Sequence, residues 1–412
     1  KFNSTVMKKW ISCIITLALF NFTIAQNASR LETWKEGIMD IHHINTGKGE
    51  CTFFILPDGT TMLIDAGAAG SKKPWATDAR PDTTRQPGEW IARYITPLLQ
   101  QTGRKKVDYA LISHFHWDHM GDVNPQTPFS SNGAYQVSGF TEVLDKIKVG
   151  KVIDRAWPDY NWPVPLDDLK VKNYRKFLAY KMEKEKTEVE RFHVGAYDQI
   201  HLTNSPAKYP SFQVRNIAAN GMVWTGVDTV SRNHIPEGTN VKEIAENGLS
   251  LALRISYGRF DYFTGGDISV RDFETAGPSH YWKDIETPIA MVTGPVEVLK
   301  ANHHGNYDAN SVSFLSKLRP RVIVIQTWGA SQPAMSVYRR MIDKSTYTGP
   351  RDIYVTNVME ETKTSFDVSK LKSSQGHILT RVYPTGDYEM IVLDDSREGH
   401  YIISRSEKYS SN

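Results

Sequence analysis

The sequence predicts an α/β fold, and three observations support this prediction. Short apolar runs rich in branched and aromatic side chains, such as residues 51–56 and 322–326, are typical of buried strands. Between such runs, residues 89–101 place apolar side chains at helical spacing, with Pro97 as an expected kink. A dense cluster of polar residues directly follows the apolar run 107–112. The 412 residues suffice for one large domain or two smaller ones.

The first 25 residues have the pattern of a secretory signal peptide. Lys8 and Lys9 precede the apolar run 10–20, and Ala25 offers a small-residue cleavage site. This run is short for a membrane span, so we expect cleavage after Ala25 and no stable span afterwards. Translation is expected to start at Met7. The sequence therefore predicts a secreted or periplasmic protein.

Removal of that segment changes the charge and the cysteine count. The full chain carries 49 basic and 46 acidic residues, and the segment contains three lysines and no acid. The remaining balance is neutral, which argues against a broad nucleic-acid surface, although a local groove stays open. Cys51 is then the single cysteine, so no internal disulfide can form.

The chain after the leader opens with three expected strands. They lie at residues 38–44, 51–56 and 61–67, and turn sequences join them at 46–50 and 57–60. The third strand ends in an aspartate, an alanine and a glycine. His42 and His43 lie in the first strand and are expected to be structural. The helix at 89–101 then leads into the strand at 107–112.

Four metal-binding side chains follow this strand within six positions: His114, His116, Asp118 and His119. If the extended backbone continues past Ser113, the first two histidines point to the same side. The aspartate and the last histidine come where the chain turns. Imidazole and carboxylate are donors that zinc accepts, so a metal site is favoured over a merely polar loop.

Residues 125–213 are less regular and read as an insert. Helices are expected at 140–147 and 169–190, with a strand at 151–154. The charges of the second helix are expected to face solvent. The aromatic, proline-bearing loop 155–163 either lines a substrate pocket or packs its rings on the core, and the sequence leaves both open.

Regular patterning resumes after the insert. Strands are expected at 249–255, 260–264, 296–301 and 322–326, and a helix at 312–318. The tail, 346–412, contains a β-hairpin with strands 377–382 and 388–393 around a turn sequence.

Two of these strands end in further metal-binding residues. Asp267 follows two glycines after strand 260–264, and a carboxylate there can bridge two cations. His303 and His304, followed by a glycine, end strand 296–301. Each motif is weak alone, but their combination with the first cluster is specific.

In the order HxHxDH, GD and HHG, these motifs resemble the metallo-β-lactamase fold superfamily. The closest resemblance is to the extracellular hydrolase domain of the ComEC competence family and its secreted relatives, over residues 38–340. It implies a metallo-β-lactamase-type αββα four-layer sandwich. It also implies one hydrolase domain over residues 26–345, with the insert at 125–213, and a C-terminal extension, 346–412, packed on that domain.

The resemblance implies a role for each motif residue. His114 and His116 would hold metal one, Asp118 and His119 would hold metal two, and Asp267 would bridge the two metals.

The resemblance leaves the roles of His303 and His304 open between two arrangements. His303 would complete metal two and His304 would be an outer donor to the transition state, although the pair could be reversed. Asp118 could also orient the nucleophile, and Asp65 would orient metal ligands. The superfamily's further histidine for metal one is not placed. His193, His201 and His234 all lie outside any motif, and none is expected to be a ligand.

The predicted function is an exported hydrolase with two divalent metal ions, zinc first and manganese second. A hydroxide that bridges the metals would attack an ester or phosphodiester. The first alternative is an extracellular nuclease of the ComEC type, which the neutral charge balance disfavours. A β-lactamase ranks lower, because many of those enzymes carry a cysteine where Asp267 stands here. A non-catalytic, metal-stabilised binding module is the last alternative, and a nearly complete two-metal ligand set argues against it.

Overall fold

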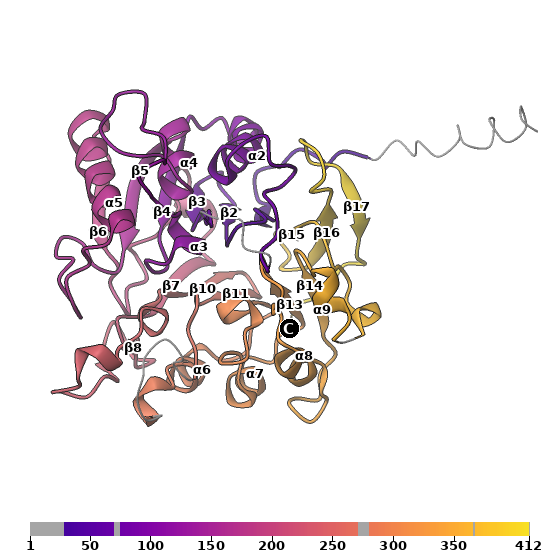
Figure 1. Ribbon diagram of the computed structural model, residues 1–412. Coiled ribbons are helices and arrows are strands. Elements are labelled where there is room, and N and C mark those ends of the chain that lie inside the picture. The colour runs from indigo at the N-terminus through magenta and orange to yellow at the C-terminus, as the bar shows by residue number, and fades with distance from the viewer. Residues whose placement is uncertain (1–28, 70–74, 271–279, 366, 412) are drawn as a thin grey trace, which may run out of the picture.

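The computed structural model describes residues 29–69, 75–270, 280–365 and 367–411 (Figure 1). The predicted signal peptide, residues 1–25, lies outside the described residues. Among the described helices, none combines the length and the apolar character that a membrane crossing requires. Two large sheets face each other and helices cover their outer sides, which is the mixed α/β fold that the sequence predicts (Figure 1).

The first sheet has nine strands within the described residues. In spatial order they are β17 (Ile402–Arg405), β16 (Tyr388–Leu393), β15 (His377–Val382), β1 (Met39–His43), β2 (Thr52–Ile55), β3 (Thr61–Ile64), β4 (Lys106–Leu111), β5 (Lys148–Asp154) and β6 (Glu188–Arg191). The parallel pairs are β3–β4, β4–β5 and β5–β6, and the other pairs are antiparallel.

The second sheet has eight strands in the same described ranges. Their order is β14 (Asp352–Val355), β13 (Val322–Ile325), β12 (Val298–Lys300), β11 (Phe260–Thr264), β10 (Ala252–Tyr257), β7 (Phe212–Ala219), β8 (Met222–Trp224) and β9 (Ser231–Asn233). Strands β11 to β14 are parallel, so their carboxyl ends lie at one edge of the sheet.

Three apolar cores match the layers. One lies between the first sheet and α2 (Pro87–Gln101), α4 (Phe140–Lys146) and α5 (Leu169–Tyr180). A second lies between the sheets, where Phe54 and Tyr262 meet with ring centroids 5.8 Å apart. The third lies between the second sheet and α6 (Glu286–Thr293), α7 (Val312–Leu318) and α8 (Met335–Ile342). The short helices α3 (Trp117–Met120) and α9 (Glu360–Lys363) lie in connections.

Both regions that the sequence sets apart contribute strands to the sheets. The insert provides β5 and β6 to the first sheet. The tail provides β14 to the second sheet and β15 to β17 to the first. The predicted hairpin at 377–382 and 388–393 is confirmed residue by residue.

The predicted helix 169–190 is wrong over residues 186–190. Helix α5 ends at Tyr180 and a π-helical turn, Lys181–Glu185, follows it. Lys186 then adopts a left-handed φ of 59°, and the chain turns into β6 beside β5. The many Lys and Glu side chains favour a helix, but pairing of residues 188–191 with β5 overrides this local preference.

Candidate metal centre

The first motif lies on a loop and a short helix rather than on an extended strand. Strand β4 ends at Leu111 and α3 begins at Trp117, so the expected extended backbone past Ser113 is wrong. The two histidines nevertheless meet, because His114 Nε2 lies 3.0 Å from His116 Nδ1. The bent loop thus brings the two imidazole side chains together, although the expected straight strand is absent.

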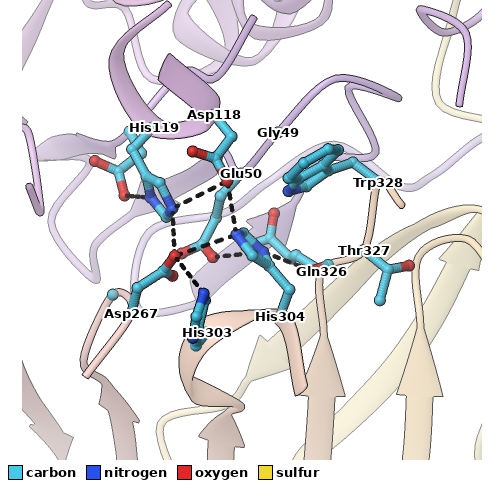
Figure 2. A network of polar contacts seen from close by, with 12 residues as sticks. Gly49, Glu50, Asp118, His119, Asp267, His303, His304, Gln326, Thr327 and Trp328 are labelled. Carbon is cyan, nitrogen blue, oxygen red and sulfur yellow. Dashed lines mark hydrogen bonds and ion pairs between the residues drawn. The ribbon is translucent and has the colours of Figure 1, made fainter. Parts of the chain in front are cut away.

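Four histidines surround one oxygen of Asp267 among the described residues, and Figure 2 shows three of them, His119, His303 and His304. The distances from Asp267 Oδ2 to their Nε2 atoms are 3.2 Å for His119, 3.5 Å for His304, and 3.8 Å for both His114 and His303. The carboxylate predicted to bridge two metals is therefore the centre on which the imidazoles converge.

Asp118 joins this group from α3. Its Oδ2 atom lies 3.2 Å from His304 Nε2 and 3.9 Å from His119 Nε2. All three side chains are nearly closed to solvent, whereas the side chain of His303 is 18% exposed. His304 is thus the inner member of the pair, and His303 faces the open side.

The Nδ1 atoms of three of the four converging histidines, His119, His303 and His304, each face an oxygen acceptor. His119 Nδ1 lies 2.8 Å from Asp65, as expected for an orienting residue, and His303 Nδ1 lies 2.8 Å from Asp308. His304 Nδ1 lies 3.0 Å from the carbonyl oxygen of Gln326. These acceptors assign the proton to Nδ1 and leave the Nε2 lone pair for a cation.

A close backbone approach brings the second and third motifs together. Gly266 has a φ of 55°, and a Cβ atom there would lie 3.0 Å from the side chains of both Ser113 and Ser250. The Gly266 carbonyl accepts a 3.1 Å hydrogen bond from the backbone N–H of His303. A side chain at this position would separate Asp267 from the HxHxDH loop.

Sequence analysis missed a buried pair of charged residues at the centre, Glu50 and Lys300. Glu50, at the end of the glycine-rich turn, accepts hydrogen bonds of 2.6 and 2.8 Å from Lys300 Nζ on β12. Oxygen and nitrogen atoms of Glu50, His119, Asp267 and His304 all lie within 4.8 Å of one another. The signals available were an acid directly before a buried strand and a lysine within an apolar one.

Glu246 is a further missed residue, and it supports the first motif from outside. One carboxylate oxygen accepts a 2.9 Å hydrogen bond from the backbone N–H of Phe115, between His114 and His116. Arg155, which is 1% exposed, donates to both oxygens of Glu246 at 2.8 and 2.5 Å. The aromatic loop therefore begins with a residue that braces the metal-binding loop.

The electrostatics of this group favour cations. Burial lowers the pKa of His304, but the carboxylates of Asp267 and Asp118 outweigh burial and raise it to about 10. Burial opposes ionisation of Asp267, but His119 and His304 hold its pKa well below its usual range. His119 Nε2 and Asp267 Oδ1 are buried and have no hydrogen-bond partner among the described residues. Buried lone pairs without a hydrogen-bond partner fit divalent metal ions.

The other histidines lie elsewhere. His42 Nδ1 lies 3.0 Å from Tyr94 OH, and His43 lies between the Ile378 carbonyl and Tyr262 OH, so both are structural, as expected. The described contacts of His193, His201 and His234 include none with the centre. Cys51 is buried and free.

The aromatic loop 155–163 lines two cavities. Trp157 and Tyr160 border a cavity of about 960 Å³ beside α5, and Trp162 borders one of about 410 Å³ with Arg155 and Asn220. Tyr160 itself is buried, and its hydroxyl donates to Asp154 at 2.7 Å. The loop thus both packs on the core and borders open space.

Comparison with known families identifies the segment that carries the first motif. Residues 46–125 match the metallo-beta-lactamase superfamily. A UPF0173 metal-dependent hydrolase from Haloquadratum walsbyi is 32% identical over 97 residues, which is 24% of this chain. The match spans 31% of that relative, so the chain covers about a third of its length.

A solved structure of a diphosphatase from the PhnP family also matches. It is 12% identical and aligns over 70% of this chain and 85% of its own, with a TM-score of 0.29. The match to the metallo-beta-lactamase superfamily thus covers residues 46–125, which contribute β2, β3 and β4 to the first sheet.

Proposed function

Because the chain carries a metallo-beta-lactamase superfamily domain with a buried candidate metal centre, we propose that it is a two-metal hydrolase of phosphodiesters. One observation carries the proposal: four imidazole Nε2 atoms lie within 3.8 Å of a single carboxylate oxygen, Asp267 Oδ2. A structural zinc site is closed by four protein donors, whereas this centre offers more donors than one ion needs.

The donors divide into two sets that share Asp267. Asp118 Oδ2 lies 3.9 Å from His119 Nε2 and 3.2 Å from His304 Nε2. We assign these three residues to metal two. His114 and His116 belong to metal one. We assign His303 as its third histidine, because Asp308 orients its Nε2 toward Asp267. The sequence analysis expected His303 at metal two and His304 as an outer donor, whereas this assignment places His304 at metal two and His303 at metal one.

Zinc is the metal that we propose, because imidazole and carboxylate donors suit it. Bound divalent ions would supply Lewis-acid activation of water and stabilise the charge that develops on the attacked group. The chain positions the groups around this chemistry: Asp65 and Asp308 hold two imidazoles in one tautomer. Asp118 lies where its carboxylate can accept a hydrogen bond from the attacking water.

The test combines metal content with turnover. Mature protein beginning at Gln26 should contain about two zinc or manganese ions per chain by mass spectrometry and should hydrolyse bis(p-nitrophenyl) phosphate. Asp267→Ala should lose both metal and activity. Asp167→Ala is the matched control, because this side chain on the insert is 68% exposed.

Each other outcome has a definite meaning. Metal without turnover of this diester would redirect the proposal to carboxylic esters, lactones and β-lactams. Metal with no turnover of any ester would favour the binding module. A metal-free protein after reconstitution with zinc would refute the central claim.

The division of ligands has its own test. His303→Ala and His304→Ala should each retain one tightly bound zinc ion in native mass spectrometry. Cobalt substitution should give different absorption spectra for the two variants, because the remaining site differs in its donors. Identical spectra would contradict the division into two sets.

We also propose that the protein is exported. Support comes from the basic, apolar and small-residue pattern of residues 1–25. N-terminal sequencing of the protein from envelope and culture fractions should find Gln26 as the first residue. A chain that keeps residues 10–20 in a cytosolic fraction would contradict export.

A further inference from the structure

Three tryptophans meet beside the metal centre. The ring of Trp328, which follows β13, lies 5.9 Å from that of His304 and 4.8 Å from that of Trp117. Trp75 lies on the other side of Trp328, with ring centroids 5.5 Å apart. An aromatic path therefore leads from a proposed metal ligand to an indole that is 43% exposed.

The backbone fixes the place of Trp75. Its carbonyl accepts a 2.8 Å hydrogen bond from the Ala330 N–H, and the Thr77 N–H donates to the Trp328 carbonyl at 2.9 Å. Ala76 and Gly329 pair between them as a β-bridge. Backbone pairing, rather than packing in a core, fixes the position of this exposed indole. Its flat apolar face can therefore bind a ligand with little loss of conformational entropy.

Trp328 adds a polar group. The residue is 6% exposed, and its Nε1 has no hydrogen-bond partner among the described residues. A buried N–H without an acceptor is unfavourable, so an oxygen atom of a ligand that accepted from it would be stabilised. Figure 2 shows the nitrogen-bearing end of this ring turned toward Asp118 and His304.

We propose that Trp75 and Trp328 form the substrate subsite of the centre. The Trp75 face stacks on a planar aromatic substituent of the substrate, and Trp328 Nε1–H donates to an oxygen of its phosphoryl group. The inference rests on the proposed function and narrows it to diesters that carry a flat unsaturated group, an aryl ring or a nucleobase.

The test measures binding apart from turnover. Zinc-loaded protein is titrated by calorimetry with methyl phosphate, phenyl phosphate and thymidine 5′-monophosphate. Phenyl phosphate should bind about three- to tenfold more tightly than methyl phosphate, as expected for one aromatic contact. The nucleotide distinguishes a nucleobase subsite from one that accepts only a simple aryl ring.

Two variants test whether Trp75 and Trp328 cause the preference for phenyl phosphate over methyl phosphate. Trp75→Ala should abolish the preference for phenyl over methyl phosphate. Trp328→Phe keeps an aromatic ring but removes the N–H, so it should weaken both probes by about two- to tenfold. Trp162→Ala is the matched control, because Trp162 is also 43% exposed but lies on the aromatic loop.

The outcomes separate the two proposals. Equal affinity for both probes, or no binding of either, overturns the subsite. Loss of the preference in Trp162→Ala rather than in Trp75→Ala moves the subsite to the aromatic loop and also overturns it. A preference for phenyl phosphate without hydrolysis of any diester leaves the subsite standing and refutes the proposed hydrolase.

Discussion

Lys300 and Glu50 form an ion pair that is closed to solvent on both sides. The exposed fractions of the two side chains are 0% and 2%, and Lys300 Nζ contacts both carboxylate oxygens. The ammonium also donates to the Gly266 carbonyl at 3.2 Å. The pair thus joins the turn before β2 in one sheet to β12 in the other and to the residue before Asp267.

Lys300→Met should strongly destabilise the protein. Removal of one partner leaves the Glu50 carboxylate buried without its counter-charge, which costs about 3–5 kcal/mol. Urea unfolding of metal-free protein measures the change in the free energy of unfolding. The double variant Glu50→Gln with Lys300→Met should recover more than half of the loss. A double variant as unstable as the single one would show that lysine packing, not charge, is responsible.

Asp308→Asn should weaken one zinc site and spare the other. The neutral amide no longer favours the Nδ1 proton of His303, and loss of such an orienting carboxylate typically costs 10–100-fold in metal affinity. Zinc titration followed by native mass spectrometry resolves the two binding steps. Asp261→Asn, on β11 outside the centre, is the control. An equal change in both steps would contradict the assignment of His303 to metal one.

Glu246→Ala should lower zinc affinity through the backbone. The Phe115 N–H loses its acceptor, so the loop between His114 and His116 loosens, and we expect about a tenfold weaker site. Glu246→Gln keeps an acceptor and should retain more affinity than the alanine variant. Competition with a chromophoric chelator measures this difference. Glu237→Ala, exposed in the same connection, should bind zinc like the wild type; a loss there would argue against a specific brace.

Glu142→Gln should stabilise the protein increasingly as the pH rises from about 4.5 to 7. Burial between α2 and α4 raises the pKa of Glu142 to about 7 from its usual 4.5. The folded state therefore favours the protonated form, so the ionisation penalty is absent below pH 4.5, grows from 4.5 to 7 and is complete above 7. The gain in the free energy of unfolding should reach about 3 kcal/mol at pH 8. Denaturant unfolding of zinc-saturated protein at pH 5 and pH 8 measures it, and an equal gain at both values would contradict this cause.

The sequence predicted the parts of the centre that are local. His114 to His119 lie within one turn of chain, and Asp267 and His304 each follow an apolar strand, so strand ends and spacing located them. The left-handed backbone of His303 and His304, with φ of 46° and 53°, has no signal beyond the following glycine. Only the packed structure shows which of the two faces inward.

The supporting residues could not be predicted, because their partners are far away in sequence. Glu50 and Lys300 are 250 positions apart, and Glu246 and Phe115 are 131 apart. Periodicity reports which face of an element is buried, but it carries no information on which distant element covers that face. The same applies to β6, whose identity as a strand depends on β5.

The pairing of β15 with β1 has a consequence for synthesis. Met39 lies opposite Val382. Strand β1 therefore cannot pair with β15 until residues 377–382 have been synthesised. Until then, β1 and β2 can form only a hairpin with an unpaired edge, which is open to wrong pairing with other chains. A ribosome-bound chain that stops before residue 377 therefore cannot complete the first sheet. The first sheet is accordingly completed only after residues 377–382 have been made and can pair with β1.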